Sequence, residues 1–352
     1  MDNHFQVSST KLKPGQTKEE QQVEEDASLL AMKMSNANAF PMVLKAALEL
    51  GVIDTIATVG HGLWLSSSEI ALRLPTKPSN PEAPVLLERM LRFLASYSVF
   101  KCRTVALEEN GQTEKVERVY AAEPVCKYLV NNSDISGSFA PLSMVHLSDV
   151  YNKTWLHLKD VILEGSDAFS CAHGMKVFEY FQTDTKFGEV FNRAMLESST
   201  IAIEKLLNVY EGFKDVKTLV DVGGGLGHTL SLITSKYPHI MGIKFDLPPV
   251  LARASPYPGV QHVAGDMFTE IPNGDAIFMK VIIVEMVTPV EAKSGDIFSN
   301  IVFGMDMAML TQCSGGKERS LTEFEALSLA SGFARCDIVC PVNPFSVIEI
   351  YK

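Results

Sequence analysis

The sequence has little that would bind nucleic acid, membranes or metal ions. Its 31 lysines and arginines are outnumbered by 42 aspartates and glutamates, which gives a net charge of −11, and no basic stripe is present to bind phosphates. No apolar run reaches the roughly 18 residues that a membrane span requires. The six cysteines form no C-x-x-C pair and no pairing with histidine at metal-ligand spacing. We therefore expect no nucleic-acid partner, no membrane insertion and no bound metal.

The first residues also lack the pattern of a targeting segment. Met1–Gln22 is polar and of mixed charge, with neither an apolar signal core nor an arginine-rich transit pattern. This predicts a disordered lead-in over residues 1–23. It also favours a cytosolic protein whose cysteines are reduced and mostly buried.

The most informative segment is a glycine-rich turn behind a short apolar strand, Leu219–His228. Glycines there allow positive φ angles and a close approach of the backbone to a ligand. No G-x-x-x-x-G-K-[ST] pattern occurs, and the dinucleotide pattern G-x-G-x-x-G fails whether it starts at Gly223 or Gly224. What remains is G-x-G-x-G behind Asp221, a form typical of S-adenosyl-L-methionine (SAM) sites. A purely structural turn is the alternative.

Two further strand ends carry groups suited to a nucleoside. Asp246 ends an apolar stretch 23 residues after Gly223, where a second parallel strand would present a carboxylate to ribose hydroxyls. A turn acid before Leu247-Pro-Pro249 is the alternative. A third predicted strand leads into Asp266 and Met267, which are suited to the amino group and the face of adenine.

The N-terminal part predicts helices followed by a hairpin. Apolar residues recur at helical spacing from Glu24 to Leu50, with Gly51 as a stop. Ser66-x-x-Glu69 is a capping box, and Pro84–Tyr97 has an apolar helical face. Two alternating stretches, near 99–107 and 117–121, flank Asn110-Gly111 and predict a hairpin.

This order is that of a winged helix, which is common in DNA-binding proteins. The predicted recognition helix offers only Arg89 and Arg92 among apolar residues, so a dimerisation domain is the better interpretation. Helices are predicted to continue from about 142 to 210. They carry a bulky apolar series that we expect to be mostly core, with a minority lining a pocket: Trp155, Phe178, Tyr180, Phe181, Phe187, Phe191 and Met195.

Several motifs along nearly the whole chain resemble the plant caffeic-acid and flavonoid type of SAM-dependent O-methyltransferase, and within it the indole-glucosinolate branch. They are Asn80–Pro84, Leu87–Arg92, Leu94–Tyr97, Phe178–Tyr180, Leu219–Gly227, Phe245–Pro248, Gly265–Phe268, Phe278–Lys280 and Gly315–Arg319.

The resemblance implies an α/β fold with a Rossmann-like SAM domain behind an all-helical, winged-helix dimerisation domain. We expect a lead-in over 1–23, the dimerisation domain over 24–135, connector and pocket helices over 136–212, and the SAM domain over 213–352. The resemblance also implies a homodimer that uses SAM to methylate a hydroxyl of a small aromatic or indolic compound. SAM would be bound by Gly223, Asp246, Asp266, Met267 and Lys280.

The chain departs from this family where the base should lie. In the family, the Phe-Met-Lys motif is followed by a tryptophan and then a His-Asp pair, whose histidine takes the phenolic proton and is flanked by the acids matching Glu285 and Glu318. Here Lys280 is followed directly by Val281–Glu285, and none of the eight histidines lies in the gap. The excision is typical of a splice variant or a gene-model product. Parallel neighbouring strands need a crossover of about a dozen residues, so the segments 276–280 and 281–286 must either merge into one strand or separate.

We therefore expect an O-methyltransferase whose activity is impaired. A non-catalytic relative that dimerises with an intact member and modulates it is the alternative, and acidity and glycine spacing disfavour a DNA-binding protein and a nicotinamide oxidoreductase. Glu285 has the alternative role of a solvent-facing strand-end acid. Glu318 has that of a helix N-terminal acid beside two predicted capping boxes, Ser320-x-x-Glu323 and Thr322-x-x-Glu325.

Overall fold

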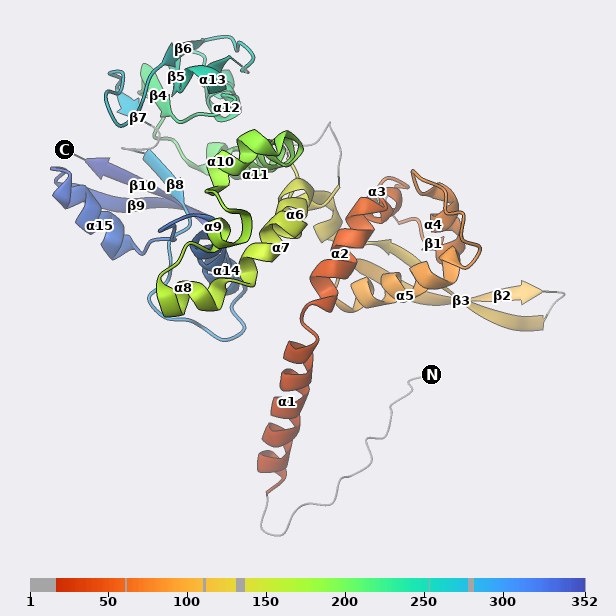
Figure 1. Cartoon of the computed structure of the whole chain (residues 1–352). Helices are drawn as coiled ribbons and strands as arrows, with labels where there is room; N and C mark the ends of the chain where they lie inside the picture. Colours follow the sequence, from red (N-terminus) through yellow and green to blue (C-terminus); the bar gives the residue numbers. More distant parts are fainter. Residues whose placement is uncertain are drawn as a thin grey trace. The chain divides into compact units, whose positions relative to one another are not determined.

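The computed structural model describes residues 17–60, 62–109, 112–130, 137–252, 254–277 and 282–351, with the side chains of 107–115 excepted. The chain divides into two compact units, Met1–Glu123 and Pro124–Lys352, coloured along the sequence in Figure 1. Residues 1–16 lie outside the described part. The expectation of a disordered lead-in up to residue 23 is wrong from residue 18 onward, where a helix begins.

That first helix, α1 (Lys18–Ser35), starts at a capping box between Thr17 and Glu20 and buries none of its residues. Its apolar side chains are 52–69% exposed: Val23, Leu29, Leu30, Met32 and Met34. The second predicted helix is confirmed as α2 (Ala39–Glu49), and Gly51 follows it with φ of 70°. The exposed apolar side chains of α1 are expected to need a partner surface.

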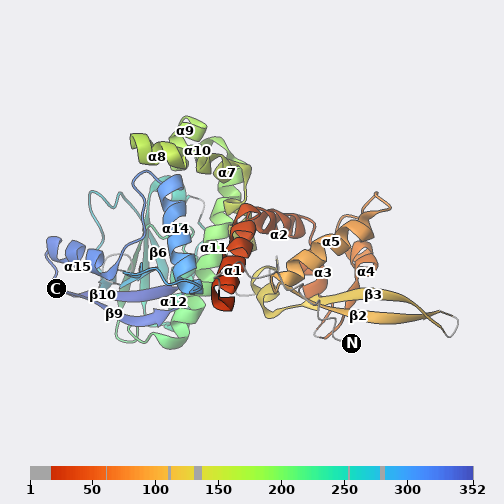
Figure 2. The ribbon, with the colours of Figure 1, turned by 90° about the horizontal axis from the view of Figure 1, so that it is seen from below.

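The rest of the first unit confirms the winged-helix order. It contains α3 (Val52–Ala57), β1 (Leu65–Ser66), α4 (Ser67–Arg73), α5 (Ala83–Ser96), β2 (Phe100–Glu109) and β3 (Gln112–Ala122). The predicted capping box of Ser66 and Glu69 starts α4. The strands β2 and β3 pair as a long antiparallel hairpin, seen in Figure 2, and β1 joins the outer side of β3.

The second unit opens with the predicted run of helices. After the 3₁₀ turn η1 (Pro124–Tyr128) come α6 (Ala140–His146), α7 (Asp149–Trp155), α8 (Leu158–Glu164), α9 (Ala168–His173), α10 (Val177–Thr183) and α11 (Thr185–Val209). Most of the predicted aromatic series packs into one core with Tyr151 and Phe169. Phe178 is the clear departure, because it is 66% exposed.

The strands of the second unit form two separate sheets. The first contains β4 (Thr218–Val222), β5 (Met241–Asp246), β6 (Val260–Ala264) and β7 (Ala276–Ile277), parallel and in the order β6-β5-β4-β7. The helices α12 (His228–Lys236) and α13 (Pro248–Leu251) lie between its strands in sequence. The second is antiparallel, in the order β8-β10-β9, with β8 (Ile282–Glu285), β9 (Arg335–Val342) and β10 (Phe345–Tyr351). The helices α14 (Ile297–Gln312) and α15 (Leu321–Ala330) precede β9.

The boundary between the sheets falls between β7 and β8, on either side of Lys280. β7 pairs with β4, whereas β8 pairs with β10, so of the two alternatives for the segments around Lys280, separation holds and a merged strand does not. Residues 278–281, including Lys280, lie outside the described part. The few residues between Ile277 and Ile282 cannot return the chain to the start of a parallel neighbour.

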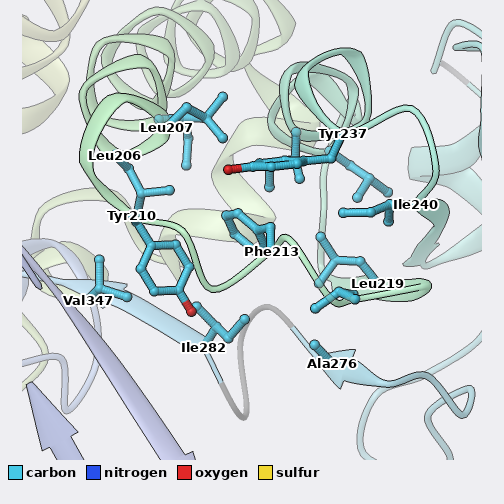
Figure 3. Close-up of a cluster of buried hydrophobic side chains, with 14 of the residues drawn as sticks. Leu206, Leu207, Tyr210, Phe213, Leu219, Tyr237, Ile240, Ala276, Ile282 and Val347 are labelled. Atoms are coloured by element: carbon cyan, nitrogen blue, oxygen red, sulfur yellow. The ribbon is translucent and has the colours of Figure 1, made fainter. Parts of the chain in front are cut away.

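One apolar cluster joins the two sheets. Phe213 lies at its centre, fully buried, with Leu219 of β4 and with Ala276 and Ile282 from the two sides of the boundary; Figure 3 shows these side chains. Tyr210 packs its ring edge against Phe213 at a centroid distance of 5.0 Å. The cluster also includes residues of α11, α12, β9 and β10.

Two smaller expectations are wrong. The box predicted at Thr322 does not form, because Ser320 caps α15 and Thr322 is already inside that helix. The cysteines are not mostly buried, since Cys102 and Cys171 are exposed and only Cys126 and Cys336 are buried.

Replacing Phe213 with alanine should destabilise the second unit by about 3–5 kcal/mol, because a fully buried aromatic ring would leave a cavity. The measurement is urea unfolding followed by circular dichroism. Leu156→Ala is the matched control, since Leu156 is 75% exposed and should change stability by less than about 0.5 kcal/mol. A loss below about 1 kcal/mol in Phe213→Ala would contradict a shared core.

Candidate functional site

The glycine turn after β4 has the backbone geometry that its sequence predicts. Gly223, Gly225 and Gly227 have φ angles of 71°, 56° and 83°, a region that other residues adopt only with strain. The N–H of Gly223 donates to the carbonyl of Phe245 at 2.8 Å. The helix α12 begins at His228, with Gly227 as its N-cap. The turn is therefore attached to the end of β5.

Asp246 is hydrogen-bonded to the middle of the glycine turn. Its Oδ2 accepts a hydrogen bond from the Gly225 N–H at 2.9 Å, and its Oδ1 accepts one from the Leu247 N–H at 2.7 Å. Each carboxylate oxygen can accept two hydrogen bonds, so both keep capacity for a further donor. The half-buried position at the end of β5 leaves this side chain accessible to a ligand.

The third strand end lies beside the second. Asp246 is paired with Ala264, so the carboxyl ends of β5 and β6 meet at one edge of the sheet. Asp266 then accepts a hydrogen bond from the Phe268 N–H at 2.9 Å. Met267 is 38% exposed and Phe268 is 91% exposed. The structure therefore brings the glycine turn, Asp246, Asp266 and Met267 to one edge, whereas Lys280 lies outside the described residues.

Two buried charges beneath the turn were not singled out as site residues by the sequence reasoning. Asp221 on β4 is 5% exposed, and Lys244 on β5 is 0% exposed and paired with it in register. Burial raises the pKa of Asp221 to about 6, with Lys244 opposing the shift and Asp246 adding to it. The signal was present in the sequence, because Lys244 interrupts an otherwise apolar strand.

The second group of predicted residues lies at the antiparallel sheet. Glu285 ends β8, and the segment after it meets the chain near Glu318 through a parallel bridge between Val287 and Arg319. Burial raises the pKa of Glu285 to about 7, the Glu318 carboxylate adds to this shift, and Arg319 opposes it. Water still reaches Glu285, which is exposed at the strand end, so screening weakens these charge effects.

Glu318 is half-buried and has a carboxylate neighbour of its own. Its N–H donates to Oδ1 of Asp306 on α14 at 2.8 Å. Burial raises the pKa of the Glu318 carboxyl, Asp306 raises it further, and Arg319 opposes the shift. The structure thus brings Glu318 close enough to Glu285 to raise the pKa of Glu285, and the sequence contains no histidine after residue 262.

Comparison with known proteins identifies this arrangement. Residues 32–132 match the O-methyltransferase dimerisation domain, and residues 155–283 match the O-methyltransferase domain. Indole glucosinolate O-methyltransferase 1 of Arabidopsis thaliana is 52% identical over 93% of this chain and 94% of its own. The chain belongs to the O-methyltransferase family.

Two further proteins are less similar but match over comparable lengths. Caffeic acid 3-O-methyltransferase of Prunus dulcis is 44% identical, covering 94% of this chain and 95% of its own. The crystal structure of human N-acetylserotonin methyltransferase in complex with SAM shares the fold, with a TM-score of 0.73 at 18% identity, over 97% of this chain and 99% of that one. No described helix of this O-methyltransferase is both long and apolar enough to cross a membrane.

The glycine turn should not tolerate a side chain at Gly224. A Cβ there would lie 2.4 Å from Oδ2 of Asp221, so Gly224→Ala should cost about 1–3 kcal/mol through overpacking. Gly304→Ala is the control, since its Cβ would meet nothing within 4 Å and alanine favours the α14 helix. Thermal unfolding of both variants provides the measurement. Equal melting temperatures would show that the turn is looser than described.

Proposed function

We propose that this O-methyltransferase binds SAM at the joined ends of β4, β5 and β6, with Gly223, Asp246, Asp266 and Met267 as the contacting residues. The observation that carries this proposal is the hydrogen bond from the Gly225 N–H to Asp246 Oδ2, at 2.9 Å, which orients the carboxylate beside the turn. The remaining acceptor capacity of Asp246 suits two ribose hydroxyls. When bound, SAM supplies a methyl group activated on a sulfonium.

The space at this edge fits such a group. A Cβ at Gly225 would meet nothing within 4 Å, so the turn is open where a ligand would lie. The exposed thioether of Met267 offers a polarisable surface to an adenine ring. Lys280 belongs to the same proposal by family resemblance.

The proposed acceptor is a hydroxyl of a small aromatic or indolic compound. The similar proteins named for indole glucosinolate and for caffeic acid support this substrate class. The helices α7 to α11 supply the aromatic side chains that could line a pocket, and Phe178 and Trp155 are the two of these with substantial exposure, 66% and 36%. Offset and edge contacts with such rings favour a planar substrate.

We propose further that methyl transfer is slow in this chain. A phenolic hydroxyl has a pKa near 10, and a positioned general base contributes about 10²–10⁴-fold to the rate. Glu285 and Glu318 have no imidazole to orient, because Lys280 is followed directly by Val281 and the histidine segment is absent.

The alignment to the relatives supports a lost segment. It extends over 359 positions although it covers only 93% of this chain of 352 residues. The relative therefore has positions with no counterpart here. The match to the O-methyltransferase domain also ends at residue 283, next to the joint between Lys280 and Val281.

Restoring the histidine segment of a relative between Lys280 and Val281 should raise the rate by at least about 10²-fold. Transfer of a radiolabelled methyl group to a panel of hydroxylated aromatic and indolic compounds would measure it. Glu318→Gln should slow the restored enzyme and barely change the present chain, because its carboxylate has no imidazolium to stabilise here.

Isothermal titration with S-adenosylhomocysteine provides the control for this experiment. Both versions should bind it, and Asp246→Ala should abolish binding in both. Equal turnover by the present and restored chains would show that another group serves as the base. Absence of binding by the folded present chain would refute the SAM site itself.

A second candidate function is a non-catalytic partner that pairs with an intact O-methyltransferase and modulates it. The observation that favours it is the dimerisation domain at residues 32–132, which lies wholly before the excision. The helix α1, none of whose residues are buried, adds apolar surface for association.

The chain should therefore form a dimer whether or not it is active. Light scattering at tens of micromolar should give about twice the 38.7 kDa of one chain. Replacing Leu29 and Met32 with glutamate should shift the mass toward the monomer, because it would put charge on the exposed α1 surface. A monomer of the unmodified chain at this concentration would count against both the dimer and the modulating role.

A further inference from the structure

Three polar side chains lie side by side in the middle of the parallel sheet. Asp221 of β4 pairs in register with Lys244 of β5, and Lys244 pairs with His262 of β6. Directly paired residues of neighbouring strands project from the same face of a sheet. In this Asp221–Lys244–His262 row, Lys244 lies two residues before Asp246 on β5.

Each member of the row has a buried polar atom that no described protein group satisfies. These atoms are Oδ2 of Asp221, Nζ of Lys244 and Nε2 of His262. The ammonium of Lys244 belongs to a side chain that is 0% exposed. Buried charges without direct partners are costly, so a row of this kind is not explained by packing alone.

The row also forms the floor of the glycine turn. A Cβ at Gly224 would lie 2.4 Å from Oδ2 of Asp221, and one at Gly227 would lie 2.9 Å from Cδ of Lys244. Nothing larger than a glycine therefore fits between the turn and these two side chains. A change in their position or charge must be transmitted to the turn.

We propose that Lys244 is a positioning residue for the cofactor, whose buried ammonium stabilises the carboxylates of Asp221 and Asp246 together and so fixes the glycine turn on Asp246. The inference rests on the proposed SAM site. The carboxylates of Asp221 and Asp246, near the ends of neighbouring strands, repel each other. Lys244 is the cation whose charge acts on Asp221.

The electrostatics of the row agree with this role. The pKa of Asp221 is raised by burial and by Asp246 and is lowered by Lys244. Burial lowers the pKa of Lys244, and the charges of Asp246 and Asp221 oppose that shift. Removing the ammonium would therefore raise the pKa of Asp221 further above its usual range.

Other titratable groups near the row are few among the described residues. Tyr257, in the segment before β6, lies 3.5 Å from the Cβ position of Gly227. His228 begins α12, and burial lowers its pKa while Glu204 opposes the shift. Lys236 at the other end of α12 is bonded to the Leu207 carbonyl. The change in charge near pH 6 is thus expected from Asp221.

The first test needs no ligand. The folded-state pKa of Asp221 is raised from 3.8 to about 6, so protonation of this carboxyl stabilises the fold below about pH 4, and this contribution is lost as pH rises to about 6. In Lys244→Met the loss should be larger and extend to higher pH. Its melting temperature relative to the unmodified chain should fall from pH 5 to pH 8, and adding Asp221→Asn should remove most of that trend.

The second test measures binding of S-adenosylhomocysteine by titration calorimetry at pH 7.5. Lys244→Met should bind about tenfold or more weakly, which corresponds to a pKa shift of about one unit in a linked group. The double variant Lys244→Met/Asp221→Asn should recover part of the loss, because the uncompensated carboxylate is gone. Lys217→Met, at an exposed lysine just before β4, is the control and should bind normally.

These outcomes separate the possible failures. If the unmodified chain does not bind S-adenosylhomocysteine, the SAM assignment fails, while the pH dependence of melting still tests the charge arrangement. If it binds and Lys244→Met binds equally, with a melting difference that does not change with pH, the positioning role is refuted. If Lys244→Met does not fold, Lys244→Gln replaces it in both tests. Glutamine keeps an uncharged polar group at the end of a side chain of similar length.

Discussion

The structure of the second unit depends on one constraint of chain length between β7 and β8. Two parallel strands of one sheet need a crossover of about a dozen residues or more, and Ile277 is separated from Ile282 by far fewer. The strands accordingly belong to different sheets, each with its own partner, β4 or β10. What still holds the sheets in one unit is the apolar cluster around Phe213, because apolar burial needs no continuous hydrogen-bond ladder.

In the proposed function, this division separates binding from chemistry. The glycine turn, Asp246 and Asp266 are all carried by the parallel sheet, whose pairing from β4 to β6 is complete. Glu285 and Glu318 are associated with the antiparallel sheet, where the Glu318 carboxylate adds to the raised pKa of Glu285 and Asp306 adds to that of Glu318. A general base acts only if it is within hydrogen-bond reach of the proton that it removes. A lost crossover therefore threatens proton removal more directly than it threatens ligand binding.

The sequence was sufficient where the signal is local. The glycine turn, the capping box at Ser66 and the hairpin depend on a few adjacent residues, and the structure has them as predicted. It was insufficient where two patterns overlap or where distant residues meet. Ser320 and Thr322 both begin an S/T-x-x-E pattern, but a helix has only one N-cap. Lys244 reads as a break in an apolar strand, and its pairing with Asp221 and His262 appears only with the strand register.

The charges beneath the turn also explain why the proposed SAM site should be more sensitive to substitution than an apolar core. An apolar core tolerates volume-conserving changes at modest cost, whereas removal of one member of a buried charged set leaves the others uncompensated. Asp221, Lys244 and Asp246 form such a set directly under a turn with no room for a Cβ at Gly224. If a crossover has been lost, as proposed, an intact arrangement of these charges favours a preserved binding function over the loss of both roles.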